Sequence, residues 1–305
     1  MNKDLQNNKI ILGLMRTRDL SVDEEYTLIK GAIDLGIHFF DISDIYGRGS
    51  CESLLGEVIK LHPELRKEML IQSKCGIIKR DLDHVVYYDL SYEHIKQACY
   101  DSLKRMNLEY LDYYLLHRPD VTFDAKEVAR AFKELYEEGK VKHFGVSNFP
   151  SEAIEYLKTE TSIPLEINQL QLGLGQLSML DEVINMNVVN NEGISRTNEI
   201  FYYLKHHKMT LQVWSPYQIG FFNGTLFNNS SYANTNALLD TLAKKYNVSS
   251  CAIATSFLFT LGDNVEVITG STNLSHIKES FDGVKIKLTK EEWYSLYVST
   301  GHNLP

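Results

Sequence analysis

Eight short runs of mostly apolar residues alternate with longer segments of helical spacing, and this alternation constrains the fold most. Runs such as Tyr113-Tyr114-Leu115-Leu116 are nearly continuous in apolar residues, as expected of parallel strands covered on both faces. The predicted strands span residues 10–15, 38–43, 69–75, 110–117, 141–147, 165–171, 210–216 and 265–271. Strands and helices that alternate over such a length predict an α/β fold, the (β/α)8 TIM barrel.

Local signals mark where several of the intervening helices begin and end. Ser21 with Glu24 three residues later has the pattern of a capping box at a helix start. Ser91 opens a second helical pattern, and Pro150 with Ser151 opens another. Gly139 stands where a glycine would end the helix before it.

The main alternative fold is a doubly wound open sheet. It is disfavoured because no Gly-x-Gly-x-x-Gly follows the first strand, where the sequence reads Gly13-Leu14-Met15-Arg16. No linker rich in Pro, Gly or Ser interrupts the alternation, so residues 1–305 are predicted to form a single barrel domain. Residues 172–195 and the segment from Gly220 to Asn236 are expected to be loops. The second either folds over an active site or is a plain surface loop.

Charge and composition disfavour several classes of function. With 31 Lys and Arg against 40 Asp and Glu, the net charge of −9 argues against nonspecific binding to DNA or an anionic membrane. No apolar run approaches the roughly 18 residues of a spanning helix, and residues 1–8 lack the apolar core of a signal peptide. The four cysteines are far apart and form no CxxC pair. We therefore expect a cytoplasmic protein with reduced thiols and no metal site.

Ionisable side chains follow three consecutive predicted strands, at the barrel end where catalytic groups lie. Asp41 and Tyr46 follow the second strand, Lys74 lies at the end of the third and His117 at the end of the fourth. Lys74 sits in an apolar run, and its burial would be costly without an acidic partner such as Asp41. Each residue alone has an ordinary structural explanation, but the four together predict a catalytic site.

Several motifs with the same order and spacing resemble the aldo-keto reductase superfamily, from about Ile10 to Trp293. They resemble most a bacterial subgroup of poorly assigned substrate. The most specific motif is the Gly-Lys-Val-x-x-x-Gly-Val-Ser-Asn-Phe run that begins at Gly139. The other matching segments are Phe40-Asp41-Ile42-Ser43-Asp44-Ile45-Tyr46-Gly47, Ser73-Lys74, Leu116-His117-Arg118-Pro119-Asp120, Asn168-Gln169, Trp214-Ser215-Pro216 and Ile268-Thr269-Gly270-Ser271-Thr272-Asn273.

The resemblance implies a barrel that reduces aldehydes and ketones with NADPH and without a metal. It implies that Tyr46 is the general acid, that Asp41 and Lys74 tune it, and that His117 orients the carbonyl group. It places Ser147, Asn148 and Gln169 on the nicotinamide carboxamide and stacks Trp214 on the nicotinamide ring. The other residues that it assigns to the cofactor, around the pyrophosphate and the 2′-phosphate, are Ser215, Pro216, Gly270, Ser271, Thr272, Asn273, His276 and Ser280.

Physical chemistry adds two expectations and leaves two other functions open. The Lys74 ammonium should lower the pKa of Tyr46. His276 stands where many relatives carry an arginine for the 2′-phosphate, so the preference for NADPH should be modest and NADH use is possible. One alternative is a redox-sensing or regulatory barrel that binds the cofactor without significant turnover. The other is an aldolase that uses Lys74 as a Schiff-base nucleophile, which requires an uncharged lysine.

Overall fold

Eight parallel strands form a closed barrel in the order β1-β10-β9-β8-β7-β6-β3-β2. The structure is a computed structural model that describes residues 9–79, 86–221 and 223–305, so the polar segment 1–8 lies outside it. The barrel strands are β1 (Ile10–Gly13), β2 (Phe39–Asp41), β3 (Leu70–Cys75), β6 (Leu111–Leu116), β7 (Val141–Ser147), β8 (Leu165–Gln171), β9 (Thr210–Trp214) and β10 (Val265–Thr269). The predicted (β/α)8 barrel is confirmed, and each predicted strand contains an observed one.

Contacts between Cα atoms divide the chain into two compact units. The first unit comprises Met1–Gln169 and Gly270–Leu274, and the second comprises Leu170–Thr269 and Ser275–Pro305. Asp41, Tyr46, Lys74 and His117 all belong to the first unit, and the two units are described separately below.

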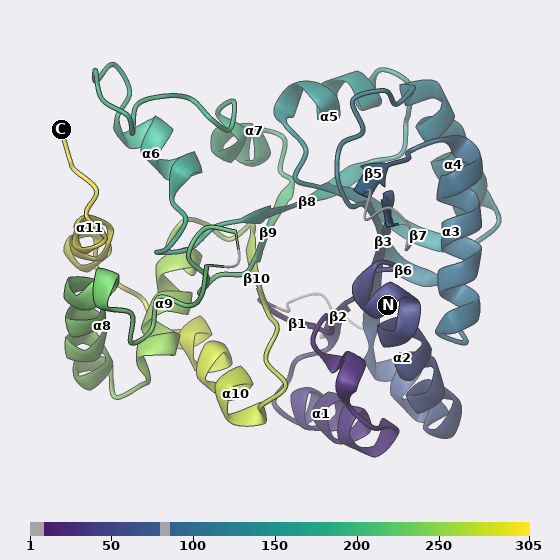
Figure 1. Ribbon diagram of the computed structural model, residues 1–305, viewed down its shortest axis with the longest axis horizontal. Coiled ribbons are helices and arrows are strands. Elements are labelled where there is room, and N and C mark those ends of the chain that lie inside the picture. The colour runs from purple at the N-terminus through teal and green to yellow at the C-terminus, as the bar shows by residue number, and fades with distance from the viewer. Residues whose placement is uncertain (1–8, 80–85, 222) are drawn as a thin grey trace. The chain divides into compact units, whose positions relative to one another are not determined.

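Helices cover the outer side of the strands in the first unit (Figure 1). They are α1 (Val22–Asp34), α2 (Ser50–Leu61), α3 (Tyr92–Arg105), α4 (Ala125–Glu137) and α5 (Ser151–Lys158). The predicted capping box is confirmed, because the Ser21 hydroxyl accepts from the Glu24 amide and the Glu24 carboxylate accepts from the Ser21 amide. Ser91 caps α3, and Gly139 follows α4 with a φ of 68°, as a terminating glycine should.

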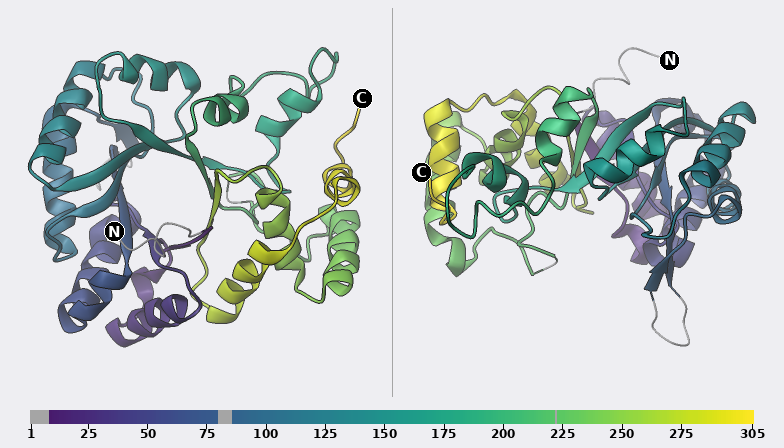
Figure 2. Two further views of the ribbon diagram at one scale, coloured as in Figure 1. Left: turned by 180° about the vertical axis from the view of Figure 1, so that it is seen from behind. Right: turned by 90° about the horizontal axis from the view of Figure 1, so that it is seen from above.

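A short antiparallel hairpin follows β3 and was not predicted from the sequence. Its strands, β4 (Ile77–Lys79) and β5 (Val86–Tyr88), pair Ile77 with Tyr88 and extend away from the barrel strands of the first unit (Figure 2). Each strand has three residues, and β5 is exposed throughout. Strands this short and this exposed carry no alternating burial pattern that a sequence can reveal.

The second unit contains α6 (Ser178–Ile184), α7 (Ile200–His206), α8 (Ala233–Tyr246), α9 (Ser250–Phe259), most of α10 (Leu274–Asp282) and α11 (Lys290–Ser299). The predicted loop over residues 172–195 is therefore wrong where α6 lies, because Met179 and Leu180 are buried there. The segment from Gly220 to Asn236 is mostly irregular, but α8 begins within it and Phe222 lies outside the described residues.

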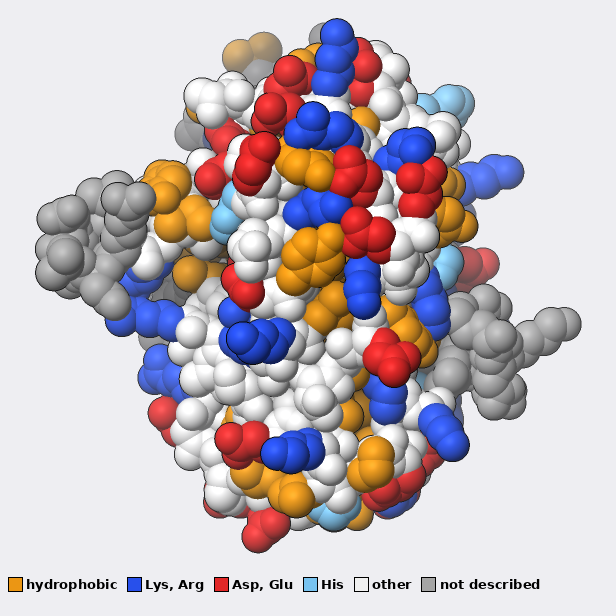
Figure 3. Space-filling view, turned by 90° about the vertical axis from the view of Figure 1, so that its right-hand side faces the viewer, with side chains coloured by type: hydrophobic (Ala, Val, Ile, Leu, Met, Phe, Trp, Pro, Cys, Tyr) orange, Lys and Arg blue, Asp and Glu red, His pale blue; other side chains and the backbone are white. Residues whose placement is uncertain are grey.

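The barrel strands bury their side chains, whereas the outer helices expose charge. All six residues of β3 are buried, including Lys74. Over α3 and α4 the acidic and basic side chains are interspersed (Figure 3), and the Lys96 ammonium lies 2.6 Å from Glu134 and 2.8 Å from Glu138. Within the described part of the chain, no helix is long and apolar enough to cross a membrane.

Candidate active site

Asp41 and Lys74 meet because their strands are neighbours. β2 pairs with β3 and places Asp41 opposite Gln72, and Lys74 follows two residues later on the same face of the strand. The Lys74 ammonium lies 2.9 Å from Asp41 Oδ2, 2.7 Å from the Ile42 carbonyl oxygen and 3.3 Å from the Tyr46 hydroxyl. Burial alone lowers the pKa of Lys74, but Asp41 and Tyr46 raise it above its ordinary value. The predicted ion pair is confirmed, and Asp41 keeps the lysine charged.

Two buried amides hold the Asp41 carboxylate in position. The Gln72 side chain donates a hydrogen bond to Asp41 Oδ1 over 2.6 Å, and the Gln169 side chain donates to the same oxygen over 3.0 Å. From the sequence, Gln169 was expected at the cofactor and Gln72 had no expected role. A carboxylate that accepts several hydrogen bonds inside a protein keeps its orientation.

Tyr46 begins a tight 3-10 turn (Tyr46–Gly49) directly after β2. Gly47 has a φ of 55°, a backbone conformation that glycine adopts more readily than other residues. Burial raises the pKa of the Tyr46 phenol above its usual value, and the charge of Lys74 opposes this rise only in part. The expected lowering of the Tyr46 pKa is therefore wrong in its net direction.

His117 lies directly after β6, where its backbone amide donates to the Cys75 carbonyl oxygen over 2.8 Å. Its ring stands nearly perpendicular to that of Tyr46, with the ring centres 5.8 Å apart. Burial lowers the pKa of His117 well below its usual value, and the charges of Lys74 and Arg118 lower it further. The ring is therefore neutral, with one nitrogen that donates and one that accepts hydrogen bonds.

The three residues expected at the nicotinamide carboxamide are linked in the first unit. The Ser147 hydroxyl donates to the Gln169 carbonyl oxygen over 3.0 Å and accepts from the Asn148 side-chain amide over 2.8 Å. Asn148 adopts a φ of 60°, and its side chain also donates to the His117 carbonyl oxygen over 3.4 Å. These neutral donors and acceptors suit a carboxamide.

The expected phosphate loop follows β10 and begins at Gly270. Ser271 accepts a hydrogen bond from the Asn273 amide over 3.1 Å, while Thr272 and Asn273 are exposed. The Arg16 guanidinium donates to the Gly270 carbonyl oxygen over 3.0 Å. This contact of Arg16 was not predicted from the sequence, because residues so far apart in the chain offer no local signal of contact.

The remaining predicted cofactor residues belong to the second unit. Trp214 is half-buried and meets Phe221 edge-on at 6.4 Å between ring centres, and Ser215 and Pro216 follow it, Ser215 with a φ of 49°. His276 is exposed near the start of α10. Ser280 is fully buried, and its hydroxyl lies 2.7 Å from the Tyr217 hydroxyl and 3.4 Å from that of Thr269.

The chemical groups of these side chains match the parts of a nicotinamide dinucleotide. Amides and a hydroxyl at Ser147 and Asn148 match a carboxamide, and the half-buried Trp214 offers a flat apolar surface for a ring. At the loop after Gly270, exposed hydroxyl groups and the cation of Arg16 suit an anion. Within the described ranges, no group of three or more His, Cys, Asp or Glu is arranged to hold a metal ion.

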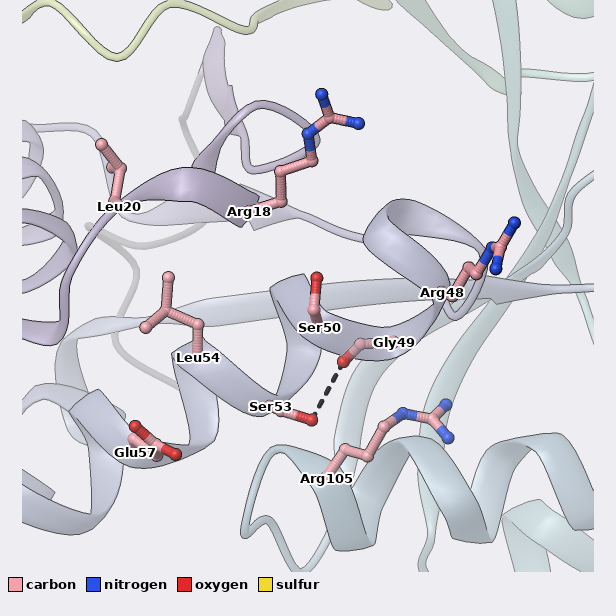
Figure 4. A pocket seen from close by; sticks show the side chains of 9 residues that line it. All are labelled: Arg18, Leu20, Arg48, Gly49, Ser50, Ser53, Leu54, Glu57 and Arg105. Atoms are coloured by element: carbon pink, nitrogen blue, oxygen red, sulfur yellow. Dashed lines mark hydrogen bonds between the residues drawn. The ribbon is translucent and has the colours of Figure 1, made fainter.

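A separate cavity of about 400 Å³ lies in the first unit, beside the start of α2 (Figure 4). Arg18, Arg48 and Arg105 line it, whereas Tyr46, Lys74 and His117 do not. Arg18 pairs with Asp19, and Arg105 pairs with Glu52. The three guanidinium groups stand apart from one another (Figure 4), so they do not form one anion site.

Comparison with known proteins identifies the family. The model of the aldo/keto reductase family matches residues 9–297. The chain belongs to the aldo/keto reductase family. It is therefore an oxidoreductase barrel, and the resemblance stated from its motifs is confirmed.

Relatives within this family cover nearly the whole chain. The oxidoreductase YdhF of Escherichia coli is 29% identical over 98% of this chain and 95% of its own length. A 6-dehydroglucose reductase of Novosphingobium aromaticivorans is 30% identical over 91% of this chain and 86% of its own. An aldo-keto reductase of Klebsiella pneumoniae solved with NADPH shares the fold, with a TM-score of 0.73 and 21% identity over 94% of this chain and 89% of that one.

Proposed function

We propose that this aldo/keto reductase reduces the carbonyl group of a small aldehyde or ketone to an alcohol, with NADPH as the hydride donor. The observation that carries the proposal is the buried Lys74, which contacts both Asp41 and the Tyr46 hydroxyl. NADPH-bound relatives and relatives named as reductases support the same reaction.

The proposed chemistry requires a proton source and a hydrogen bond for the oxygen that gains negative charge. Tyr46 is protonated, because burial raises the pKa of its phenol, and it can therefore supply the proton. Lys74 lies close enough to stabilise the phenolate that remains, and Asp41 keeps Lys74 charged. The neutral ring of His117 can donate one hydrogen bond to the same oxygen.

We also propose which residues bind the cofactor. When bound, NADPH supplies the hydride. Ser147, Asn148 and Gln169 would bind the carboxamide and Trp214 would pack on the ring. For the phosphate groups we propose the remaining residues Ser215, Pro216, Gly270, Ser271, Thr272, Asn273, His276 and Ser280.

The aldolase alternative is disfavoured because it needs an uncharged Lys74. Asp41 raises the pKa of this lysine, whereas Schiff-base formation requires the free amine. A regulatory barrel would also bind the cofactor, so the two functions are distinguished by measuring whether the protein turns over a substrate. A stoichiometric NADPH complex without turnover on any aldehyde, ketone or quinone would support that reading.

The Tyr46→Phe variant tests the role of the proton donor. We expect kcat for aldehyde reduction to fall by roughly 10²–10⁴-fold, the usual contribution of general acid catalysis. NADPH affinity should hardly change, since the substitution removes only the hydroxyl group. The measurements are steady-state oxidation of NADPH and a fluorescence titration of the cofactor.

A matched control is Tyr156→Phe, because Tyr156 is an exposed tyrosine on α5. This variant should keep the wild-type kcat. Near-normal turnover by Tyr46→Phe with several unrelated aldehydes would refute the assignment of Tyr46.

The His276→Arg variant tests cofactor choice. The nearby cation Lys278 pairs with Asp282 over 2.6 Å, and His276 is exposed. An arginine can bind a phosphate group with two parallel hydrogen bonds, so we expect NADPH to bind about tenfold more tightly and NADH to bind unchanged. Equal effects on the two dissociation constants would mean that this position does not contact the 2′-phosphate.

A further inference from the structure

Ser43 connects His117 to a second acidic residue in the first unit. It lies between Asp41 and Tyr46 in sequence and is fully buried. Its hydroxyl oxygen lies 3.0 Å from His117 Nδ1 and 3.1 Å from Asp44 Oδ1. The Lys74 carbonyl oxygen is 3.4 Å away, and the Ile45 amide donates to the hydroxyl over 3.4 Å.

The serine hydroxyl has one proton to share among these neighbours. If it donates to Asp44, its oxygen must accept from His117, so the proton of the neutral ring is on Nδ1. If it donates to His117, the ring proton is on Nε2. Because His117 has a pKa far below its usual value, the ring stays neutral and these are its two states near neutral pH.

The charge of Asp44 decides between the two arrangements. An ionised carboxylate only accepts hydrogen bonds and takes the serine proton in a strong, charge-assisted bond. A protonated carboxyl group can instead donate to Ser43. Burial raises the pKa of Asp44 to about 7, with a further rise from Glu52, while Ser43 and Arg105 act in the opposite direction.

Charged and titratable groups face this chain of hydrogen bonds from several elements. Glu52 on α2 accepts from Arg105 on α3 over 2.8 Å, so these two charges largely compensate each other. The other groups that act electrostatically on Asp44 or His117 are Tyr46, Lys74, Cys75, Tyr114 and Arg118. Burial raises the pKa of the Cys75 thiol and that of the Tyr114 phenol well above their usual values, so both groups are neutral near pH 7.

We propose that Ser43 and Asp44 are positioning residues that set which nitrogen of His117 carries the proton. When Asp44 is protonated, it donates a hydrogen bond to Ser43 and Ser43 donates to His117 Nδ1, so the proton of the ring is on Nε2 and can be donated to the carbonyl oxygen. Loss of one proton reverses the direction of both hydrogen bonds. Asp44 passes its proton to Ser43, Ser43 passes its own to Nδ1, and Nε2 releases one to solvent.

This inference rests on the proposed function only where it concerns activity. Because Nε2 without a proton cannot donate to the carbonyl oxygen, kcat for reduction should fall as the pH rises through about 7. The loss should reach roughly 10²-fold, the usual effect of removing one hydrogen-bond donor to an oxyanion.

The direct test is nitrogen NMR of the histidine rings in ¹⁵N-labelled protein, with the His117 signals identified by their loss in His117→Asn. We expect the proton on Nε2 at pH 6 and on Nδ1 at pH 8.5. Ser43→Ala and Asp44→Asn should each abolish this change, and Ser43→Thr, which keeps a hydroxyl group, should restore it. Ser53→Ala, which removes a hydroxyl on α2 that donates to the Gly49 carbonyl oxygen, is the matched control and should behave like wild type.

The outcomes separate this inference from the proposed function. A His117 proton that stays on one nitrogen from pH 6 to 8.5 in the wild type overturns it. A change that persists in Asp44→Asn also overturns it, because another group would then control the ring. A change that depends on Ser43 and Asp44 in a protein without turnover supports the inference and counts against the proposed function alone.

Discussion

Lys74 is a fully buried cation, and three oxygen atoms explain why the fold tolerates it. Asp41, Ile42 and Tyr46 each place an oxygen within 3.3 Å of the ammonium. A buried charge without such partners costs several kcal/mol. The position of a lysine within an apolar strand was sufficient to predict an acidic partner at Asp41.

Glu25 is a contrasting case, a buried carboxyl group whose surroundings offset the effect of burial only weakly. It lies on α1, it is fully buried, and among the described residues neither of its oxygens has a hydrogen-bond partner. The nearby Thr17 hydroxyl donates to the Leu14 carbonyl oxygen instead. Burial therefore raises the pKa of Glu25 to about 8.

This pKa predicts a pH-dependent stability. Between the unfolded value of 4.5 and the folded value of about 8, the folded state holds a proton that the unfolded state has lost. The free energy of unfolding should therefore fall as the pH rises from about 5 to 8, by on the order of 4 kcal/mol. Glu25→Gln should lack this contribution and be more stable than the wild type at pH 9, as measured by urea unfolding.

The control for Glu25 is Glu57→Gln, which changes an exposed carboxylate on α2. Its stability should follow that of the wild type at every pH. If the wild type and Glu25→Gln lose stability in parallel between pH 5 and 8, Glu25 is ionised in the folded protein.

At the residue scale, the sequence did not predict those properties of a side chain that depend on its three-dimensional surroundings. The strand ends were sufficient to predict that Asp41, Tyr46, Lys74 and His117 lie close together at one end of the strands. The raised pKa of Tyr46 was not predictable, because it depends on how deeply the phenol is buried. Gln72 and Arg16 were missed for a similar reason: their contacts join residues from distant parts of the chain or from neighbouring strands.

At the element scale, periodic patterns identified the barrel strands and the long helices. Most of the barrel strands lie in runs that are nearly continuous in apolar residues, and capping signals located the starts of α1 and α3. The hairpin β4–β5 and the seven-residue α6 were missed, since neither is long enough for a period to repeat.

The packing of α2 on α3 depends on Gly56. A Cβ atom at this position would lie 2.0 Å from the Arg105 backbone oxygen, which a rotamer change cannot relieve. We expect Gly56→Ala to destabilise the protein by about 1–3 kcal/mol, although alanine is the better helix former. The change in the urea midpoint measures this effect.

Glu57→Ala provides the comparison for Gly56→Ala, because it adds the same residue type at the adjacent, exposed position of α2. Its stability should remain within about 0.5 kcal/mol of the wild type. A Gly56→Ala protein that is as stable as Glu57→Ala would mean that α2 and α3 are less closely packed.

At the scale of the whole molecule, the chain divides into two compact units. Residues Gly270–Leu274 belong to the first unit although the chain on both sides belongs to the second. The Leu274 side chain reaches α1, where a Cβ atom at Gly31 would lie 2.5 Å from it. The predicted single domain over residues 1–305 remains a proposal, because compactness alone does not establish whether the units unfold together.

We expect both units to unfold in one transition, because the eight strands form a single closed barrel. The chain provides a separate probe for each unit. Both tryptophans, Trp214 and Trp293, belong to the second unit, so their fluorescence reports on it. Cys51, Cys75 and Cys99 are buried in the first unit, so their reaction with a thiol reagent reports on that one.

The experiment uses a Cys251→Ser protein, which removes the one cysteine of the second unit. Fluorescence and pulsed thiol labelling are followed across the same urea series. Coincident midpoints and slopes would establish one cooperative domain. Thiols that react at a lower urea concentration than the fluorescence change, or at a higher one, would mean that the two units unfold independently and that the chain comprises two domains.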